Sequence, residues 1–157
     1  MAEGKRLVIF GDSIAKGVTY QDGRYHLCRA HDFDALAQQG VEVLNFAKMG
    51  ACTDTGLAIA KKRLELCQGA QVLLSFGGND CDFDWQAVSD RPEEAHLPKI
   101  PAEQFLENYR ALMDLVRQTT SRVWISSLVP LEAHRFLDHV SQGRSRENIL
   151  TWLGDTD

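Results

Sequence analysis

Paired cysteines, long apolar runs and an excess of positive charge are all missing from this sequence. Its four cysteines, Cys28, Cys52, Cys67 and Cys81, stand singly, without a Cys-x-x-Cys pair. This spacing argues against a disulfide framework or a zinc site, and it favours free thiols in a reducing compartment. We therefore predict a cytoplasmic protein.

Membrane insertion and nucleic-acid binding are not expected. The longest apolar runs are about five to six residues, whereas a membrane-spanning helix needs about 20. The first residues lack the apolar core and the cleavage site of a signal peptide. With 17 basic and 22 acidic residues the net charge is −5, and no basic face stands out.

What is present is the composition of an ordinary globular protein. The chain has 157 residues, of which 44% are hydrophobic and 25% are charged. This length and composition suit one folded domain over residues 1–157, with a core of its own.

Short apolar segments alternate with segments of helical periodicity. The predicted strands cover residues 7–10, 41–46, 71–76 and 122–129. The predicted helices cover about 54–67, about 102–119 and a segment between 26 and 39. Such alternation predicts the α/β class, with a parallel sheet covered by helices on both faces. Residues 82–101, which contain three prolines, are expected to form a long irregular excursion.

Polar and glycine-rich residues follow three of these strands. They are Gly11-Asp12-Ser13, Met49-Gly50-Ala51 and Gly77-Gly78-Asn79-Asp80. In a parallel sheet such segments gather at one edge, where ligands bind. Ser13, at the expected start of a helix, supplies a nucleophilic hydroxyl for acyl transfer. Its own N–H, the Gly50 N–H and the Asn79 amide supply donors for an oxyanion. Taken singly, the glycines also fit ordinary turns.

These motifs resemble those of the SGNH (GDSL-type) hydrolase family, over essentially the whole chain. The matching residues are Gly-Asp-Ser at 11–13, the glycine at 50 and Gly-x-Asn-Asp at 77–80. The resemblance implies a flavodoxin-like three-layer α/β/α sandwich, with Ser13 as nucleophile and Gly50 and Asn79 in the oxyanion hole. It also implies hydrolysis of a small-molecule ester with an acetyl or short acyl group, and no cofactor. We further expect Asp12, Asp80 and Trp85 to bind the substrate.

One motif of that family is missing. No Asp-x-x-His, the source of the family's histidine base, occurs in the sequence. A serine without a base is a poor nucleophile. The chain thus resembles a C-terminally shortened member without the last strand and helix. Its fourth strand should then be an open edge that favours self-association or marginal stability.

Two functions remain open on these grounds. The first is a serine esterase, for which His134, just beyond the fourth strand, is the candidate substitute base and His139 a weaker one. The second is a non-catalytic remnant or ligand-binding module of the same fold.

A calcium loop over Asp80, Asp82 and Asp84 is the alternative for the acidic segment. The calcium pattern requires a glycine where Trp85 stands, so the match fails. We expect these carboxylates to be solvated or to cap a helix, and we expect no metal. The sequence contains no Walker loop and no Gly-x-Gly-x-x-Gly, so nucleotide binding is not predicted either.

Overall fold

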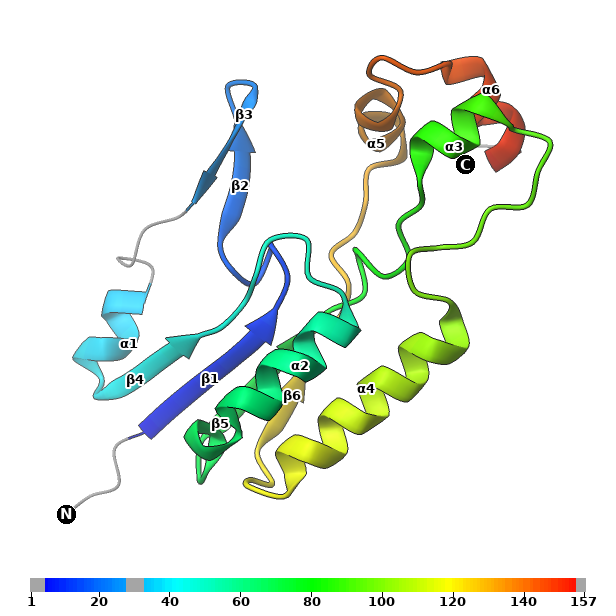
Figure 1. Cartoon of the computed structure of the whole chain (residues 1–157). Helices are drawn as coiled ribbons and strands as arrows, with labels where there is room; N and C mark the ends of the chain where they lie inside the picture. The colour runs from blue at the N-terminus through cyan, green and yellow to red at the C-terminus, as the bar shows by residue number, and fades with distance from the viewer. Residues whose placement is uncertain (1–4, 28–32, 155–157) are drawn as a thin grey trace.

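The computed structural model describes residues 5–27 and 33–154. Within these residues a parallel sheet of four strands forms the centre of the molecule, in the order β4-β1-β5-β6 (Figure 1). The strands are β1 (Lys5–Gly11), β4 (Val41–Asn45), β5 (Gln71–Ser75) and β6 (Val123–Ile125). This arrangement confirms the predicted α/β class with a flavodoxin-like parallel sheet, and it leaves β6 at the edge.

The pairing of the strands aligns their carboxyl ends. Val8 of β1 pairs with Leu44 of β4 and with Val72 of β5, and Val72 pairs in turn with Val123 of β6. Aliphatic residues along buried parallel strands are typical of such sheets. Because the register is in step across the sheet, the loops that follow the strands leave it at a common edge.

Two helices lie side by side over one face of the sheet. They are α2 (Thr53–Arg63), which continues as a 3₁₀ helix over Leu64–Cys67, and α4 (Ala102–Arg117) (Figure 1). The main core forms beneath them, where Leu112 and Val116 of α4 pack with Val8, Phe10 and Leu74 of the sheet. Burying one such side chain stabilises the fold by about 1.5–3 kcal/mol. The helices predicted at about 54–67 and 102–119 are confirmed.

The opposite face of the sheet is less covered by the described residues. Helix α1 (Asp34–Gln38) contacts β4. Leu7 and Leu73, whose side chains alternate with the buried set, are only half-buried, and Trp124 is 60% exposed. The helix that was predicted between residues 26 and 39 is observed as α1, over Asp34–Gln38. Residues 28–32, including Cys28, lie outside the described part of the chain.

The segment that contains Ser13 differs from its prediction, because no helix follows β1. Residues 12–17 form turns, and they lead into an antiparallel hairpin of β2 (Val18–Gln21) and β3 (Arg24–Leu27). The single helical turn, in which the Lys16 N–H donates to the Asp12 carbonyl at 3.0 Å, ends at Gly17 with a φ of 84°. This left-handed residue and the β-favouring Val-Thr-Tyr that follows it explain why the helix does not continue.

Three helices form a separate unit beyond the carboxyl edge of the sheet, which we call the helical cap. They are α3 (Trp85–Asp90), α5 (Ala133–Val140) and α6 (Arg146–Leu153) (Figure 1). Their buried cluster is distinct from the main core and consists of Val88, Leu137, Val140 and Ile149. The excursion over 82–101 thus contains one short helix and is otherwise irregular, as expected. The described residues form two buried clusters and not one continuous core. The prediction that residues 1–157 form one domain therefore stays a prediction.

No helix within residues 5–27 and 33–154 combines the length and the apolar content that a membrane crossing requires. In the same residues Cys52, Cys67 and Cys81 are free thiols. Burial raises the pKa of the Cys67 thiol to about 11. Burial and, next in size, the charge of Asp80 raise the pKa of Cys52 to about 11.

Candidate active site

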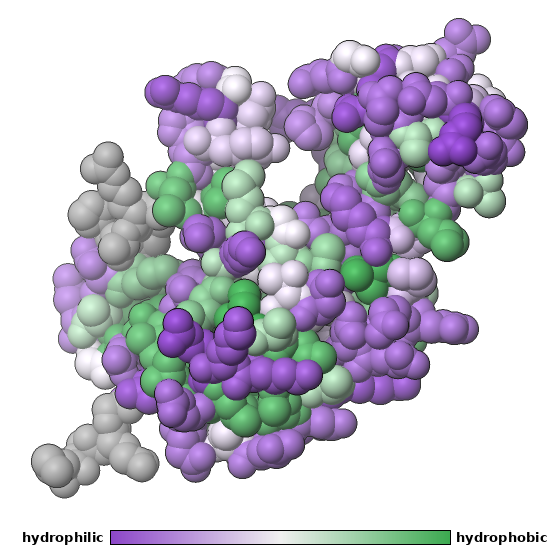
Figure 2. All heavy atoms as spheres, in the orientation of Figure 1, coloured by the Kyte–Doolittle hydropathy of each residue, from purple (hydrophilic) through white to green (hydrophobic). Residues whose placement is uncertain are grey.

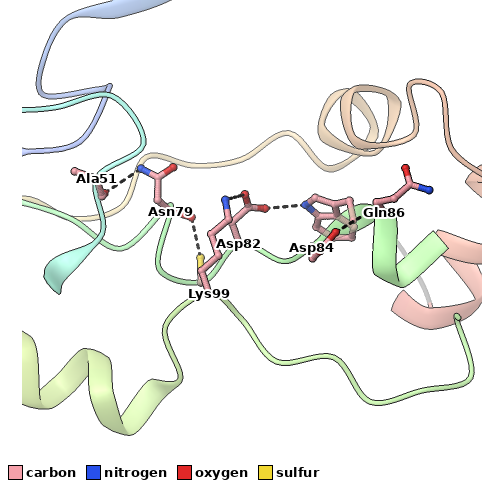
Figure 3. A network of polar contacts seen from close by, with 9 residues as sticks. Ala51, Asn79, Asp82, Asp84, Gln86 and Lys99 are labelled. Atoms are coloured by element: carbon pink, nitrogen blue, oxygen red, sulfur yellow. Dashed lines mark hydrogen bonds and ion pairs between the residues drawn. The ribbon is translucent and has the colours of Figure 1, made fainter. Parts of the chain in front are cut away.

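Loops that follow β1, β4 and β5 meet at the carboxyl edge of the sheet. The Asn79 side-chain amide donates to the Ala51 carbonyl at 3.2 Å, which joins the loop after β5 to the loop after β4 (Figure 3). The Asp12 N–H donates to the Ser75 carbonyl at 3.2 Å and so joins the loop after β1 to the end of β5. The three segments singled out in the sequence therefore lie together.

Ser13 is half-buried in the turn after β1. The Asp12 carboxylate, which is 5% exposed, accepts the Ile14 N–H at 2.9 Å and closes a tight turn around Ser13. The Ser13 carbonyl accepts the Val18 N–H at 2.9 Å. Its hydroxyl makes no hydrogen bond to another residue in the described part of the chain. The backbone of Ser13 is thus fixed while its hydroxyl stays available.

Gly50 occupies the tip of the loop after β4. Its φ of +72° lies in the left-handed region, and a Cβ added there would meet no atom within 4 Å. Glycine is required here by backbone conformation and not by crowding. Gly50 is exposed at this tip.

Asn79 is held by the bond to Ala51, which uses one of the two amide N–H groups of its side chain. The other N–H remains for a ligand. The backbone before it is also constrained, since Gly77 has a φ of +133° and a Cβ there would meet the Leu128 side chain at 2.8 Å. The loop after β5 therefore packs against the segment that leads to α5.

Asp80, which was expected to bind the substrate, is buried and bonded within the protein. The side chain is 2% exposed, and one carboxylate oxygen accepts both the N–H and the hydroxyl of Thr53, at 2.8 and 2.6 Å. The other oxygen, Oδ2, has no partner. Because Thr53 begins α2, the carboxylate faces a helix N-terminus, where negative charge is favourable. Burial and the charge of Asp80 raise the pKa of Tyr109 to about 12.

The other acidic residues of this segment are also committed to contacts within the protein (Figure 3). Asp84 caps α3 by accepting the N–H groups of Gln86 and Ala87, both at 3.1 Å, which confirms a cap role. Asp82 accepts the Trp85 indole N–H and the Lys99 ammonium, both at 2.7 Å. Over residues 5–27 and 33–154 no group of three acidic, histidine or cysteine side chains is placed to hold a metal ion.

The structure does not bring the candidate histidines to the site. His134 lies exposed in the first turn of α5, where its N–H donates to the Glu132 side chain at 3.3 Å. His139 is exposed in the last turn of the same helix. No hydrogen bond joins either side chain to Ser13 within the described residues.

A groove with a volume of about 790 Å³ runs from the carboxyl edge of the sheet to the helical cap. Asp12, Asn79 and Trp85 line it, whereas Ser13 and Gly50 do not. Sequence reasoning missed the contribution of α5, whose apolar residues at 133, 136, 137 and 140 line the far wall. The helical spacing of these apolar residues was the feature of the sequence that could have indicated this wall.

No family model and no curated protein matches the sequence. Solved structures do resemble it. The chain is 19% identical to TesA with a TM-score of 0.57, over 97% of this chain and 72% of that chain. For a lipase/acylhydrolase from Enterococcus faecalis the identity is 22% and the TM-score 0.55, over 96% of this chain and 68% of that one.

A third similar structure is AlinE4, described as an SGNH-hydrolase family esterase. The identity is 16% and the TM-score 0.51, over 99% of this chain and 82% of that chain. At these identities the likeness establishes the fold alone. Together with the order of the strands, it shows that this chain has the fold of the SGNH hydrolases.

Proposed function

We propose that the protein is a serine hydrolase of carboxylic esters, with Ser13 as the nucleophile. The observation that carries the proposal is the convergence of the loops after β1, β4 and β5 at one sheet edge, tied together by the Asn79–Ala51 and Asp12–Ser75 hydrogen bonds. In the proposal, the Ser13 hydroxyl, the Gly50 N–H and the Asn79 amide, one from each of these loops, act together on the ester. The likeness to esterases and acylhydrolases in fold supports the same class of reaction.

The reaction follows from the roles of these groups. The Ser13 oxygen attacks the ester carbonyl, and the hydroxyl proton passes to water. The negative oxygen of the tetrahedral intermediate is held by the N–H groups of Ser13 and Gly50 and by the Asn79 amide. The carbon–oxygen bond to the alcohol breaks, and the alcohol leaves with a proton from water. A second water molecule then attacks the acyl-serine and releases the acid.

Proton transfer is the weak step of this scheme. No Asp-x-x-His occurs in the sequence, and His134 and His139 are exposed on α5. A serine protease that loses its histidine retains a rate of only about 10³–10⁴ over water, from its oxyanion donors and substrate binding. We expect turnover of that order for this polypeptide.

The test compares hydrolysis of p-nitrophenyl esters by the wild-type chain and by Ser13→Ala. Loss of the rate above background in Ser13→Ala supports the proposal, because the Ser13 hydroxyl has no structural bond to lose. Equal rates in the two proteins overturn it. His134→Ala is the companion variant, and unchanged activity is expected, since His134 is exposed on α5 and no hydrogen bond joins it to Ser13.

The second candidate is a ligand-binding module without turnover. The observation that favours it is the same exposure of His134 and His139, which leaves Ser13 without a base among the described residues. The Ser13→Ala variant separates the two candidates. If the protein is a hydrolase, the variant loses ester hydrolysis. If the protein is a binding module, the variant binds an uncleaved ligand as the wild-type chain does.

A further inference from the structure

We propose that the Asp12 carboxylate is the general base that activates the hydrolytic water. The inference rests on the proposed function, and it supplies the group that takes a proton in the second half of that reaction. Asp12 lies at the carboxyl edge of the sheet and lines the groove, and its side chain is 5% exposed. A largely buried carboxylate that faces a cleft is a candidate for proton transfer.

Three titratable side chains line the groove within residues 5–27 and 33–154. They are Asp12, Cys81 and Asp82. Both oxygens of Asp82 accept hydrogen bonds, one of them from the Lys99 ammonium at 2.7 Å. The Cys81 thiol donates its proton to the Gly78 carbonyl at 3.4 Å. Asp12 is therefore the groove-lining group with an oxygen left to accept a proton.

The two oxygens of the Asp12 carboxylate have different surroundings. Oδ1 accepts the Ile14 N–H at 2.9 Å, whereas no residue of the described part of the chain donates to Oδ2 or forms an ion pair with it. Oδ2 lies beside Gly78, because a Cβ built on Gly78 would be 3.9 Å from Oδ2 and would meet no other atom within 4 Å. The missing side chain at position 78 thus leaves an atom-sized space next to the unpartnered oxygen.

Hydrogen bonds of the backbone hold Asp12 in this position. Its N–H donates to the Ser75 carbonyl at 3.2 Å, and its carbonyl accepts the Lys16 N–H at 3.0 Å. Together with the Ile14 bond, these contacts fix the residue at the end of β1. A base that is held in this way needs no rearrangement before it takes a proton.

Asn79 connects this carboxylate to the reacting carbonyl. Asn79 follows Gly78 directly, and it lines the groove as Asp12 does. In the proposed function the acyl carbonyl oxygen is held by the Asn79 amide, so the carbonyl carbon lies at the same end of the groove. Ser13 does not line the groove. We therefore assign Asp12 to the water that attacks the acyl group, and not to activation of the Ser13 hydroxyl.

The step is balanced in bonds and protons. The water oxygen forms a bond to the acyl carbon while Asp12 Oδ2 takes one proton from the water. The tetrahedral intermediate then collapses, and the bond between the acyl carbon and Ser13 Oγ breaks. The protonated Asp12 carboxyl returns the proton to Oγ. The carboxylic acid leaves, and both side chains regain their initial states.

Solvent has a route to this end of the groove. The groove runs from the carboxyl edge of the sheet to the helical cap. Figure 2 shows the helical cap standing apart from the β2–β3 hairpin above the sheet, with an opening between them. A base at the carboxyl edge can therefore draw its water from that opening.

The first experiment follows the release of p-nitrophenol from p-nitrophenyl acetate by Asp12→Asn. Asparagine keeps an oxygen for the Ile14 N–H and suits the same turn, but it is not a base. We expect release of about one equivalent per chain and then arrest, with the steady-state rate lowered by about 10²-fold or more. Peptide mapping should find the acetyl group on Ser13. Asp114→Asn, at an exposed carboxylate on α4, is the control and should turn over as the wild type does.

Hydroxylamine separates the loss of a base from a distortion of the site. It is a stronger nucleophile than water and attacks an acyl group without a general base, so it should restore turnover in the arrested variant. Asp12→Ser, whose hydroxyl can accept the same N–H, should arrest in the same way. Wild-type turnover in Asp12→Asn overturns the proposal. Loss of the initial release, or an arrest that hydroxylamine does not relieve, also overturns it.

The same assay distinguishes failure of this inference from failure of the proposed function. Turnover that Ser13→Ala loses and Asp12→Asn retains keeps the hydrolase and overturns Asp12 as the base. Turnover that Asp12→Asn loses and Ser13→Ala retains overturns Ser13 as the nucleophile, and it keeps Asp12 as the base for a water that attacks the ester directly. Release at the background rate by the wild-type chain overturns both.

Discussion

The carboxylate of Asp80 accepts two hydrogen bonds from Thr53, a residue 27 positions earlier in the chain, with the N–H at 2.8 Å and the hydroxyl at 2.6 Å. This pair joins the loop after β5 to the first residue of α2. It also fixes the relative positions of Gly50 and Asn79, which stand on either side of it in the two loops. The geometry of the candidate site thus depends on a contact between two buried residues.

Thr53→Val should destabilise the protein. The substitution keeps the volume and removes the hydroxyl, so Asp80 retains only the N–H and the Asn108 amide, which donates to Thr53 at 3.2 Å, loses its acceptor. A buried polar group left without its partner costs about 1–3 kcal/mol. Urea denaturation measures the free energy of unfolding. Thr151→Val, at an exposed hydroxyl, is the control and should change it by less than about 0.5 kcal/mol. Equal midpoints for both variants would contradict the prediction.

Gly50→Ala and Gly143→Ala form a matched pair for the oxyanion hole. Both glycines have left-handed backbones, with φ of +72° and +71°, and an added Cβ meets no atom within 4 Å at either. Each substitution should therefore cost about 1–2 kcal/mol in stability, from backbone strain alone. Only Gly50→Ala should also lose ester hydrolysis, because strain at that position displaces an N–H donor, and losing a donor completely costs about 10²–10³ in kcat. A similar loss of activity in Gly143→Ala would show that stability alone is responsible.

Thiol modification should be selective at pH 8. Cys81 is exposed, whereas Cys52 and Cys67 have pKa values raised to about 11. A thiol with that pKa is about one part in a thousand thiolate at pH 8, and the thiolate is the reactive form. Peptide mapping after brief alkylation should find Cys81 modified and Cys52 and Cys67 modified only in denaturant. Rapid labelling of Cys67 in the native protein would contradict its buried position.

The edge strand β6 should promote self-association at high concentration. Its outer side is unpaired within the described residues, and Trp124 and Ile125 are 60% and 52% exposed. Open edges with apolar side chains pair readily with a second chain. Size-exclusion chromatography over a concentration series should show the wild type shifting to larger species and Trp124→Lys remaining monomeric. Leu97→Lys, at an exposed residue away from the edge, is the control, and a monomeric wild type at all concentrations would refute the idea.

The sheet was predictable because its information is local. Short apolar strands with helices between them predict a parallel sheet, and the resemblance in motifs implies the flavodoxin-like order of its strands. The turn at Ser13 was not predicted, because it depends on the left-handed backbone of Gly17, which ends the helical turn after β1, and on the β-favouring residues that follow. Apolar periodicity carries no information on such a conformation.

The directions of the side chains at the site also could not be predicted from the sequence. The sequence places Asp80 beside Asn79, yet one faces α2 in the interior and the other reaches the loop after β4. The periodicity of residues 133–140 likewise shows an apolar helix face but not what that face lies against. That face also lines the groove, and this became visible only once α5 was placed over the end of the sheet.

The separate buried cluster of the helical cap has a consequence for how the molecule fluctuates. A unit with its own apolar cluster, joined to the sheet by irregular segments, opens as a cooperative unit at a lower free energy than global unfolding. Amide hydrogens of α5 and α6 should therefore exchange with solvent sooner than those of β1 and β5. The strands β1 and β5, which precede Ser13 and Asn79, would keep their register throughout that partial opening.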